Sequence, residues 1–434
     1  MRWWILALLS VLVVAGCASD EGAQTAPESP AEVGVEEVPS VEPDEASEEP
    51  TEPPPDEADP SPEPDVDGPL VATPVRAVWV HLFDDTLKSR EGIATLVEEL
   101  LAAEATMVIA QVARRHDAYY DSQVLPASED PALEDGLDVL AELTDRAHAA
   151  GIEVHAWVSV APTWHAVYDE LPAPAGWVPA EHGRAAPAAD RWVTRTVDGD
   201  WSEYLDPALP EVREHIVAVV EEFAERSRVD GVHLDYVRYE SARHGYHPRT
   251  LERYEQETGA TGVPAPDDPA FVAWRQDQTR GLIEEVRAAL EQAPRRVALS
   301  APVVTWGPGP SGLASGSFAD TRTARDGLQD WPSWARAGLV DVLFPMNYFR
   351  DHEPEQGAWL EQWLEFENEL ATATDTLIVP GIAGWLNTRE ATVRQVAMAT
   401  TRTDGAAVYS YQQPTDDGSR EVWRELAEDA WGAG

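Results

Sequence analysis

Eight short apolar runs recur between residues 69 and 434, and segments with the periodicity of amphipathic helices separate them. The predicted strands are residues 76–83, 106–113, 152–160, 231–239, 296–304, 340–349, 376–382 and 405–411. The predicted helices are residues 92–103, 137–150, 210–228, 269–292, 331–337, 357–371, 389–401 and 420–431. Eight strand–helix units in one chain of this size favour an α/β fold, a (β/α)8 TIM-type barrel with long βα loops.

Two further features bear on this fold. A doubly wound sheet is the alternative, but no glycine-rich phosphate loop follows the first predicted strand, so its usual ligand signature is missing. The long helix 210–228 is preceded by Asp206-Pro207, which predicts an N-cap and first turn at that point. Residues 69–434 contain no low-complexity break, so we expect one large domain.

Two ionisable side chains, His233 and Asp235, lie two residues apart in the predicted strand 231–239. Successive side chains of a strand point to opposite faces, so these two share one face, while Val232 and Leu234 share the other. In a barrel the apolar face lies under the helices and the polar face enters the lumen. Asp235, at the strand end, is predicted as the principal catalytic carboxylate, with a structural pairing to Arg238 as the alternative. His233, one layer deeper, is predicted to support Asp235 through hydrogen bonds.

Polar and aromatic side chains also gather at the ends of other predicted strands. In a dry core each polar group would need a partner, whereas a lumen open at one end explains them together. A sugar ring has apolar faces and a rim of hydroxyls, so aromatic walls with nearby polar groups predict a carbohydrate cleft. The predicted substrate contacts are Trp79, Gln111, His155, Trp157, His233, Arg238, Asn347, Tyr348, Trp385 and Tyr411. The long loop after the third strand adds Trp164, Trp177, Trp192 and Trp201 to the predicted cleft.

A glycoside hydrolase usually needs a second carboxyl group, and the sequence leaves its identity open. The candidates are Asp117, Glu240 and Asp351, with Asp84 and Asp85 also possible. No closely spaced His and Asp set of the catalytic zinc type is present, so no metal or other cofactor is expected. No Gly-x-Ser-x-Gly motif follows a strand, which disfavours a serine hydrolase.

The first 17 residues predict an address outside the cytoplasm. Arg2 precedes an apolar run that is too short to span a bilayer comfortably, as in a signal peptide covering residues 1–16. The run ends in Val14-Ala15-Gly16-Cys17, which resembles the bacterial lipobox, where the cysteine is lipidated after cleavage. We expect an extracytoplasmic lipoprotein anchored to the membrane through Cys17. A plain secretory signal with a chance cysteine is the alternative.

Residues 18–68 contain 18 acidic residues, 11 prolines and no lysine or arginine. Such a segment cannot bury enough apolar surface to offset its ordering entropy, so residues 17–68 are predicted as a disordered linker. The whole chain has a formal net charge of −48, of which residues 69–434 carry −31. This charge argues against nucleic acid as a partner, and we expect a monomer that binds a polysaccharide.

Short motifs follow one another in order over residues 75–415. They are Arg-Ala-Val-Trp at 76–79, Gln-Val at 111–112, Asp-Ala-Tyr-Tyr at 117–120, Val-His-Ala-Trp at 154–157, Leu-Asp-Pro at 205–207, Glu-Val-Arg at 211–213, Asp-Gly-Val-His-Leu-Asp-Tyr at 230–236, Gln-Asp-Trp at 329–331, Gly-Leu-Val-Asp-Val-Leu-Phe-Pro-Met-Asn-Tyr at 338–348, Pro-Gly-Ile at 380–382 and Tyr-Ser-Tyr at 409–411. In these motifs the chain resembles the bacterial glycosyl hydrolase-like 10 family, a TIM-barrel group of exported, often lipid-anchored proteins. The resemblance implies hydrolysis of a glycan, and cell-wall strands stripped of peptides are one substrate associated with the family.

Carried over position by position, the family's functional residues fall on Asp235 in strand four, Gln111 and Asp117 after strand two, and Asn347 and Tyr348 after strand six. Three positions depart from the family pattern. Ala113 replaces a frequent arginine, Tyr236 replaces a second aspartate, and Glu240 replaces a proline. The resulting hypothesis is a hydrolase of a cell-envelope polysaccharide, most simply peptidoglycan strands without peptides. A non-catalytic, glycan-binding lipoprotein is the alternative.

Overall fold

The computed structural model describes residues 69–163, 173–310 and 317–431. The predicted signal peptide, the lipidation site Cys17, the linker and Trp164 lie outside the described residues. The strands are β1 (Val75–Val80), β2 (Met107–Ala113), β3 (Glu153–Ser159), β4 (Val193–Arg195), β5 (Trp201–Leu205), β6 (Gly231–Asp235), β7 (Ala298–Val304), β8 (Val342–Asn347), β9 (Leu377–Ile378), β10 (Gly381–Ala383) and β11 (Gly405–Tyr409).

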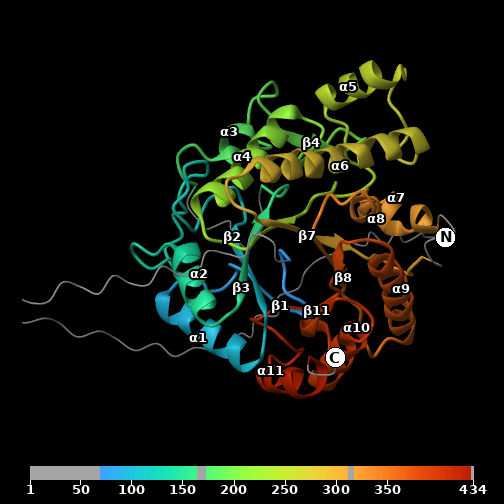
Figure 1. Ribbon diagram of the computed structural model, residues 1–434. Coiled ribbons are helices and arrows are strands. Elements are labelled where there is room, and N and C mark those ends of the chain that lie inside the picture. The colour runs from blue at the N-terminus through green and yellow to red at the C-terminus, as the bar shows by residue number, and fades with distance from the viewer. Residues whose placement is uncertain (1–68, 164–172, 311–316, 432–434) are drawn as a thin grey trace, which may run out of the picture. The chain divides into compact units, whose positions relative to one another are not determined.

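Nine of these strands form one sheet in the order β10-β11-β1-β2-β3-β6-β7-β8-β9, with every pairing parallel. β8 pairs with both β9 and β10, which therefore occupy one position and close the sheet into a barrel of eight strand positions. The helices form an outer ring around these strands (Figure 1). The predicted (β/α)8 TIM-type barrel is confirmed.

The helices agree with the predicted segments and include three that were not predicted. Their bounds are α1 (Arg90–Ala102), α2 (Val139–Ala149), α3 (Val178–His182), α4 (Pro210–Arg226), α5 (Pro248–Thr258), α6 (Pro269–Gln292), α7 (Arg322–Arg325), α8 (Trp331–Arg336), α9 (Pro354–Ala373), α10 (Arg389–Thr400) and α11 (Glu421–Glu425). Within the described ranges, none of these helices combines the length and the apolar character needed to cross a bilayer.

The start of α4 differs from the prediction. Its N-cap is Leu209 and Pro210 occupies the first helical turn, where a missing N–H costs nothing. The Asp206 carboxylate is instead fully buried and accepts hydrogen bonds from the Tyr239 hydroxyl at 3.3 Å and the Thr250 hydroxyl at 3.1 Å. The prediction of an Asp206-Pro207 cap was therefore wrong, because this aspartate fastens α4 to α5 and to the chain beyond β6.

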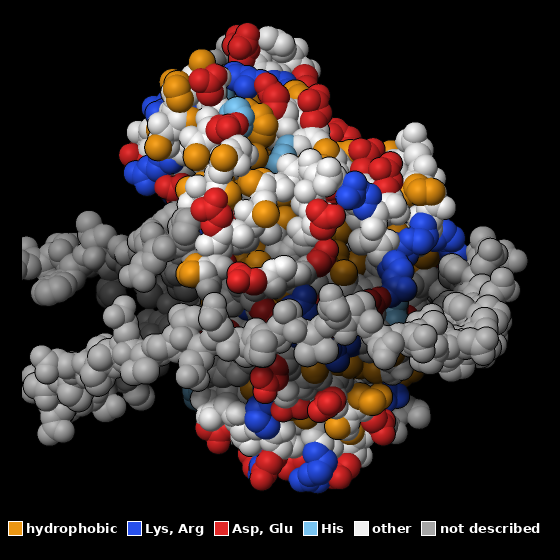
Figure 2. All heavy atoms as spheres, turned by 90° about the vertical axis from the view of Figure 1, so that its left-hand side faces the viewer, with side chains coloured by type: hydrophobic (Ala, Val, Ile, Leu, Met, Phe, Trp, Pro, Cys, Tyr) orange, Lys and Arg blue, Asp and Glu red, His pale blue; other side chains and the backbone are white. Residues whose placement is uncertain are grey.

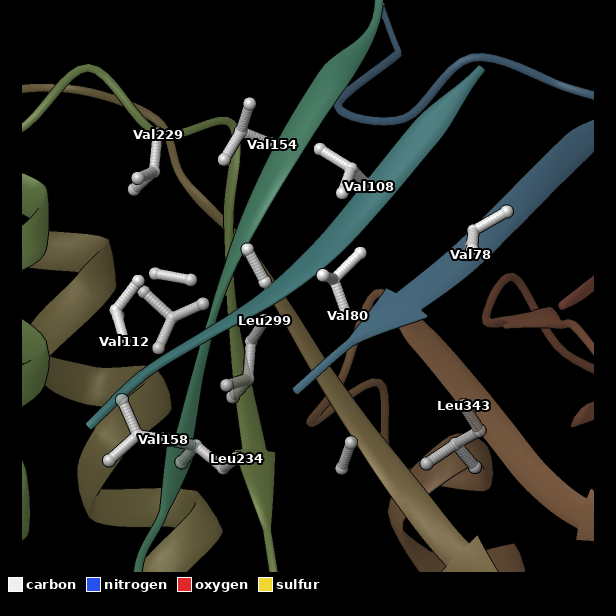
Figure 3. Close-up of a cluster of buried hydrophobic side chains, with 14 of the residues drawn as sticks. Val78, Val80, Val108, Val112, Val154, Val158, Val229, Leu234, Leu299 and Leu343 are labelled. Carbon is white, nitrogen blue, oxygen red and sulfur yellow. The ribbon is translucent and has the colours of Figure 1, made fainter. Parts of the chain in front are cut away.

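The two faces of the barrel strands bury different side chains. The outward face carries valines and leucines that pack under the helices, including those of β1, β2, β3 and β6 in Figure 3. Burying one such side chain stabilises the fold by about 1.5–3 kcal/mol. The inward face holds a smaller cluster around Trp79, Trp157 and Phe344. Strand alternation thus separates the packing that holds the barrel from the groups that line its lumen.

The long loop between β3 and α4 is not irregular throughout, as the sequence had suggested. It contains the antiparallel hairpin β4–β5, which continues the C-terminal end of β3 through a bridge between Pro162 and Tyr204. Together with α3 and α5 it adds structure at the C-terminal end of the barrel. The hairpin was missed because its strands are only three and five residues long, too short to show alternation.

Gly231, at the start of β6, lies directly against a side chain that fills the lumen. An added Cβ would lie 2.4–2.6 Å from three atoms of the His155 ring, which is fully buried and hydrogen-bonded. We expect Gly231→Ala to lower the free energy of unfolding by about 1–3 kcal/mol, measured by urea denaturation. Gly357→Ala in α9, where a Cβ meets nothing within 4 Å, should instead be neutral or stabilising. Equal stability of the two variants would contradict a tightly packed lumen.

Candidate active site

The floor of the lumen is a hydrogen-bonded layer of neutral side chains. The Trp79 indole N–H donates to Nε2 of His233 at 3.1 Å, and Nδ1 of His233 lies 3.0 Å from the Ser300 hydroxyl. Nδ1 of His155 lies 2.8 Å from the same hydroxyl. Burial lowers the pKa of His155 to about 4 and that of His233 well below its usual value. Both imidazoles are therefore neutral near pH 7 and hold the floor rather than carry protons.

Asp235 lies one layer above this floor, at the last position of β6. Its Oδ2 accepts a hydrogen bond from the Trp157 indole at 3.1 Å, and its Oδ1 accepts one from the backbone N–H of Tyr236 at 2.7 Å. Tyr236 has a φ of 64°, so the chain turns sharply at this point and ends the strand. Burial raises the pKa of Asp235 to about 6, against the opposing effects of Arg238 and the two hydrogen bonds.

His233 was predicted to support Asp235 by a hydrogen bond, but the structure connects them differently. The partners of His233 are Trp79 and Ser300, and its ring packs edge-on against Trp157 at 6.4 Å. Trp157 is the residue that donates to the Asp235 carboxylate. The support from the histidine layer therefore reaches Asp235 through packing against this indole.

Four tyrosines from separate segments surround Asp235, and we call them the tyrosine wall. They are Tyr204 on β5, Tyr236 after β6, Tyr348 after β8 and Tyr409 at the end of β11. The rings pair at centroid distances of 5.7 Å for Tyr204 with Tyr236 and 5.6 Å for Tyr348 with Tyr409. All four are partly exposed. Burial, and then nearby charges that include Asp235, raise the pKa of Tyr236 and Tyr348 well above the usual value, so their hydroxyls stay protonated.

The Arg238 side chain packs against the tyrosine wall through cation–π contacts. Its guanidinium lies 5.1 Å from the ring centre of Tyr236, 5.2 Å from that of Trp306 and 6.0 Å from that of Tyr204. One of its nitrogens donates to the backbone oxygen of Tyr239 at 3.1 Å. Arg238 is therefore held by aromatic faces beside Asp235 and is not joined to that carboxylate by an ion pair. Because no ion pair joins the Arg238 guanidinium to a carboxylate among the described residues, its positive charge favours neutral or anionic groups on a bound ligand.

The opposite side of the mouth is built from β1, β2 and β11. The amide oxygen of Gln111 accepts from the backbone N–H of Leu82, and its nitrogen donates to Ser159 at 3.2 Å. Ser159 lies directly opposite Asp235 in the β3–β6 register. On the β1 side, Asp84 accepts a hydrogen bond from Gln412 at 3.2 Å, and Gln412 also donates to the backbone oxygen of His81. Asp84 is therefore a rim residue, three strand positions away from β6.

The three main candidates for the second carboxylate form their hydrogen bonds and ion pairs with groups other than Asp235. Asp117 is fully buried and pairs with Arg115 at 3.0 Å. Glu240 accepts from Ser202 at 2.7 Å and pairs with His244 at 3.2 Å. Asp351 is exposed and pairs with Arg394. Asp85, the fifth acid considered, is exposed and pairs with Lys88. None of these carboxylates hydrogen-bonds to Asp235, and Asp84 is the one placed at the rim.

Two predicted substrate contacts, Asn347 and Tyr411, lie outside the lumen, and a third, Trp385, follows the end of β10. Asn347 points away from the lumen and donates to both carboxylate oxygens of Glu367 on α9, at 2.9 and 3.1 Å. Tyr411 lies beyond the end of β11, stacked on Trp423 under the guanidinium of Arg420. Trp385 is half-buried in the 3-10 turn Gly384–Leu386 after β10. Asn347 and Tyr411 are therefore packing residues of the helical layer, and their predicted role as substrate contacts is not supported.

The loop tryptophans mostly pack against protein groups. Trp192 stacks on His182 at 3.7 Å, Trp201 lies under Arg191 and Arg195, and Trp177 lies under Arg115. Tyr204 and Trp306 at the mouth were not selected from the sequence. Tyr204 lies on the missed hairpin, and Trp306 stands alone after β7, so neither carried a local signal. In the described part of the chain, no three His, Cys, Asp or Glu side chains are arranged to hold a metal.

The chain matches known proteins over its barrel. It is 25% identical over 304 residues to glycosyl hydrolase YngK of Bacillus subtilis (strain 168), which covers 63% of this chain and 54% of that protein. It is 27% identical over 313 residues to glycosyl hydrolase DigH of Escherichia coli (strain K12), which covers 64% of each. The match thus spans between half and two thirds of the length of these curated relatives.

Solved structures with the same fold include two enzyme domains. The glycoside hydrolase domain of PgaB (BpsB) from Bordetella bronchiseptica superposes with a TM-score of 0.57 and 16% identity, covering 82% of this chain and 98% of that one. The catalytic domain of β-amylase from Paenibacillus polymyxa gives a TM-score of 0.59 and 13% identity, covering 83% and 99%. At these identities the likeness establishes the fold. The sequence model of the glycosyl hydrolase-like 10 family matches residues 74–387. Because this match spans most of the barrel, the chain belongs to the glycosyl hydrolase-like 10 family.

Proposed function

We propose that this protein hydrolyses glycosidic bonds in a polysaccharide of the cell envelope, with peptide-free peptidoglycan strands as the first substrate to test. Asp235 carries the proposal. It is a carboxyl group with a raised pKa at the open end of a TIM barrel, held by Trp157 and Tyr236 and facing partly exposed aromatic rings. A carboxyl that keeps its proton near pH 6 is suited to protonate a leaving glycosidic oxygen.

The setting around Asp235 fits a sugar. The tyrosine wall, Trp157 and Trp306 offer flat faces for the apolar side of a pyranose, while Gln111 and Arg238 offer polar groups. The family and the names of its curated relatives, both called glycosyl hydrolases, point the same way. We propose Asp84 at the rim as the first candidate for a second carboxylate, followed by Glu240, which like Asp235 acts on the pKa of Tyr204.

The test is to incubate the purified full chain with peptide-free glycan strands and, separately, with intact peptidoglycan, and to identify released fragments by mass spectrometry. We expect fragments from the peptide-free strands. The variants Asp84→Asn, Asp117→Asn and Glu240→Gln, compared with Asp351→Asn as the exposed control, should show which carboxylate acts with Asp235. Loss of about 100-fold or more in one variant, with Asp351→Asn unchanged, would identify it.

A second candidate function is glycan binding without cleavage. It is favoured by one observation: among the described residues, no second carboxylate hydrogen-bonds to Asp235 or contributes to its pKa shift. If the chain binds the strands in a sedimentation assay and releases no fragments, the binding function replaces the hydrolase. In either case we propose that the protein acts outside the cytoplasm, held at the membrane by a lipid on Cys17, on the strength of the lipobox-like Val14-Ala15-Gly16-Cys17.

A further inference from the structure

A cavity of about 180 Å³ lies on the outside of the barrel, between α2 and α4. These two helices lead into the neighbouring strands β3 and β6, so they are adjacent in the helical ring (Figure 1). The lining comes from α2, from the C-terminal half of α4 and from the segment that follows β2, and it shares no residue with the mouth around Asp235. A cavity of this volume admits a molecule of about six heavy atoms.

The most enclosed acid of the lining is Glu222 on α4, which is 5% exposed. Its carboxylate accepts hydrogen bonds from the Ser122 hydroxyl at 2.6 Å, from the Tyr120 hydroxyl at 3.3 Å and from the backbone N–H of Gln123. All three donors are neutral, and in the described part of the chain no cationic side chain forms an ion pair with this carboxylate. A buried carboxylate without a countercharge is costly, so this position favours a bound cation.

A second carboxylate, that of Asp138, lines the same cavity. It caps the N-terminus of α2 and accepts from the backbone N–H groups of Ala141 at 2.8 Å and of Asp121 at 3.0 Å, which are also neutral donors. Burial, and then the charge of Glu222, raise the pKa of the Tyr120 hydroxyl above its usual value, and Asp138 acts in the same direction. Both carboxylates therefore lie near one phenol oxygen. An ammonium group has three N–H donors and no acceptor, which matches these three acceptors.

The cationic side chains of the lining pair with acids at the opening of the cavity. Arg226 pairs with Asp121 at 3.6 Å, and Arg228 pairs with Asp145. Each ion pair joins the α4 side of the cavity to the opposite side, and the four side chains are between 46% and 75% exposed. Such exposed pairs contribute little stability, so they can open for a ligand. The two inner carboxylates remain available to it.

Part of the lining is apolar. The rings of Tyr120 and Phe223 pack with their centres 4.9 Å apart, and Leu140 and Ala141 add aliphatic surface. A cation with a hydrocarbon body can place its carbon atoms on this surface while its charge meets the carboxylates. Among the residues that the structure describes, no three His, Cys, Asp or Glu side chains are arranged to hold a metal ion. The lining therefore favours an organic cation over an inorganic one.

We propose that this cavity is a binding site for a small alkylammonium ion. The ammonium group donates to Glu222, to Asp138 and to the phenol oxygen of Tyr120, and the hydrocarbon chain lies against Tyr120 and Phe223. The site is separate from the proposed glycoside hydrolysis, because it lies between two helices on the outside of the barrel. A ligand at this point contacts both α2 and α4 and stabilises the folded chain by mass action.

The test measures the binding of butylamine to the purified full chain at neutral pH by calorimetry. Butanol has the same number of heavy atoms and no charge, so it is the matched ligand control. We expect butylamine to bind at least about 10-fold more tightly, because hydrogen bonds between charged groups are the stronger ones and butanol leaves the carboxylates without a countercharge. Saturating butylamine should also raise the unfolding temperature, and butanol at the same concentration should not.

Substitutions in the lining locate the site. Glu222→Gln and Asp138→Asn should each lower the affinity for butylamine by about 10-fold, and asparagine still caps α2. Arg226→Gln should raise the affinity by about 3-fold, because it removes a positive charge from the lining. Glu221→Gln removes an exposed acid from the same helix and should leave the affinity unchanged.

Equal affinities for butylamine and butanol would overturn the proposal, and so would the absence of saturable butylamine binding. Equal losses in Glu221→Gln and Glu222→Gln would also overturn it, because they indicate general attraction to a negatively charged protein. If Glu222→Gln does not fold, Asp138→Asn decides: weaker binding supports the site, and unchanged binding rejects it.

Discussion

Replacing Asp235 by asparagine is expected to lower kcat on peptide-free glycan strands by about three orders of magnitude. Asparagine has the same shape and can still accept the hydrogen bond from the Trp157 indole. It can neither transfer a proton nor carry a negative charge, and proton transfer by a positioned carboxyl contributes about 10²- to 10⁴-fold. The measurement is the initial rate of new reducing ends, with Asp351→Asn as the control for loss of an exposed acid.

The same substitution should remove a pH-dependent loss of stability, which can be measured separately from the loss of activity. The pKa of Asp235 is raised from 3.8 to about 6, so the folded protein binds this proton more tightly than the unfolded chain does. Stability therefore falls as the pH rises from about 3.8 to about 6, and the loss persists above pH 6. Asparagine avoids this cost of about 1–3 kcal/mol at neutral pH, but its amide group can accept only one of the two hydrogen bonds that Trp157 and Tyr236 donate. The stability of Asp235→Asn relative to the unmodified chain should therefore be higher at pH 8 than at pH 4, and an equal difference in unfolding temperature at the two pH values would contradict the raised pKa of this carboxyl.

The pH profile of the unmodified enzyme identifies the role of Asp235. A rate that declines above about pH 6 assigns it as the general acid, and a rate that declines below that value assigns it as a base or nucleophile. We expect the former, because the raised pKa keeps the proton available. A profile with no limb near pH 6, in an enzyme that loses activity in Asp235→Asn, would show that the substrate shifts this pKa on binding.

The second large effect concerns Glu367, a fully buried acid on α9 far from solvent. Burial raises its pKa from 4.5 to about 8, and the hydrogen bond from Asn347 opposes this only in part. Between these two pH values the folded protein holds a proton that the unfolded chain releases. Stability should therefore fall by about 1.4 kcal/mol for each pH unit, and the fall ends near pH 8.

Glu367→Gln is expected to remove this slope and to raise the free energy of unfolding by about 3 kcal/mol at pH 7. Glutamine accepts the same hydrogen bond from Asn347 and stays neutral, and its own N–H group can reach the Asn347 oxygen, which has no partner at present. Chemical denaturation at several pH values measures the difference. Glu365→Gln, on the exposed face of the same helix, controls for the loss of one negative charge. Parallel pH profiles for Glu367→Gln and the unmodified protein would contradict a neutral Glu367.

The barrel itself was predictable because its strands are buried on both faces in a regular way. Val232 and Leu234 alternate with His233 and Asp235, and the structure places the first pair under the helices and the second pair in the lumen. The same alternation would have placed Asn347 correctly, since Val342 and Phe344 on its strand face inward and position 347 has the opposite parity. Asn347 was selected because it lies at a predicted strand end and matches a family position, and local parity proved the better guide.

Contacts across the mouth could not be predicted from spacing. The tyrosine wall combines Tyr204 of the β4–β5 hairpin with tyrosines at or just after the ends of β6, β8 and β11, and only the folded barrel with its hairpin brings them together. The partners of the candidate acids were equally unpredictable. Asp117 and Glu240 follow strand ends, but they form ion pairs with Arg115 and His244. The partners of a polar residue in a βα loop depend on which other segments pack against that loop, and residue spacing does not show these segments.

The way the chain enters the barrel has a mechanical consequence. Val71 and Leu70 pack among the first residues of the strands, and the backbone N–H of Ala72 donates to Glu153 at the start of β3. The chain thus joins the barrel at its base, at the end opposite Asp235 and the tyrosine wall. If a lipid on Cys17 anchors the protein as we propose, a force on Pro69 would act at the base of the barrel and leave the mouth with Asp235 free to bind a substrate.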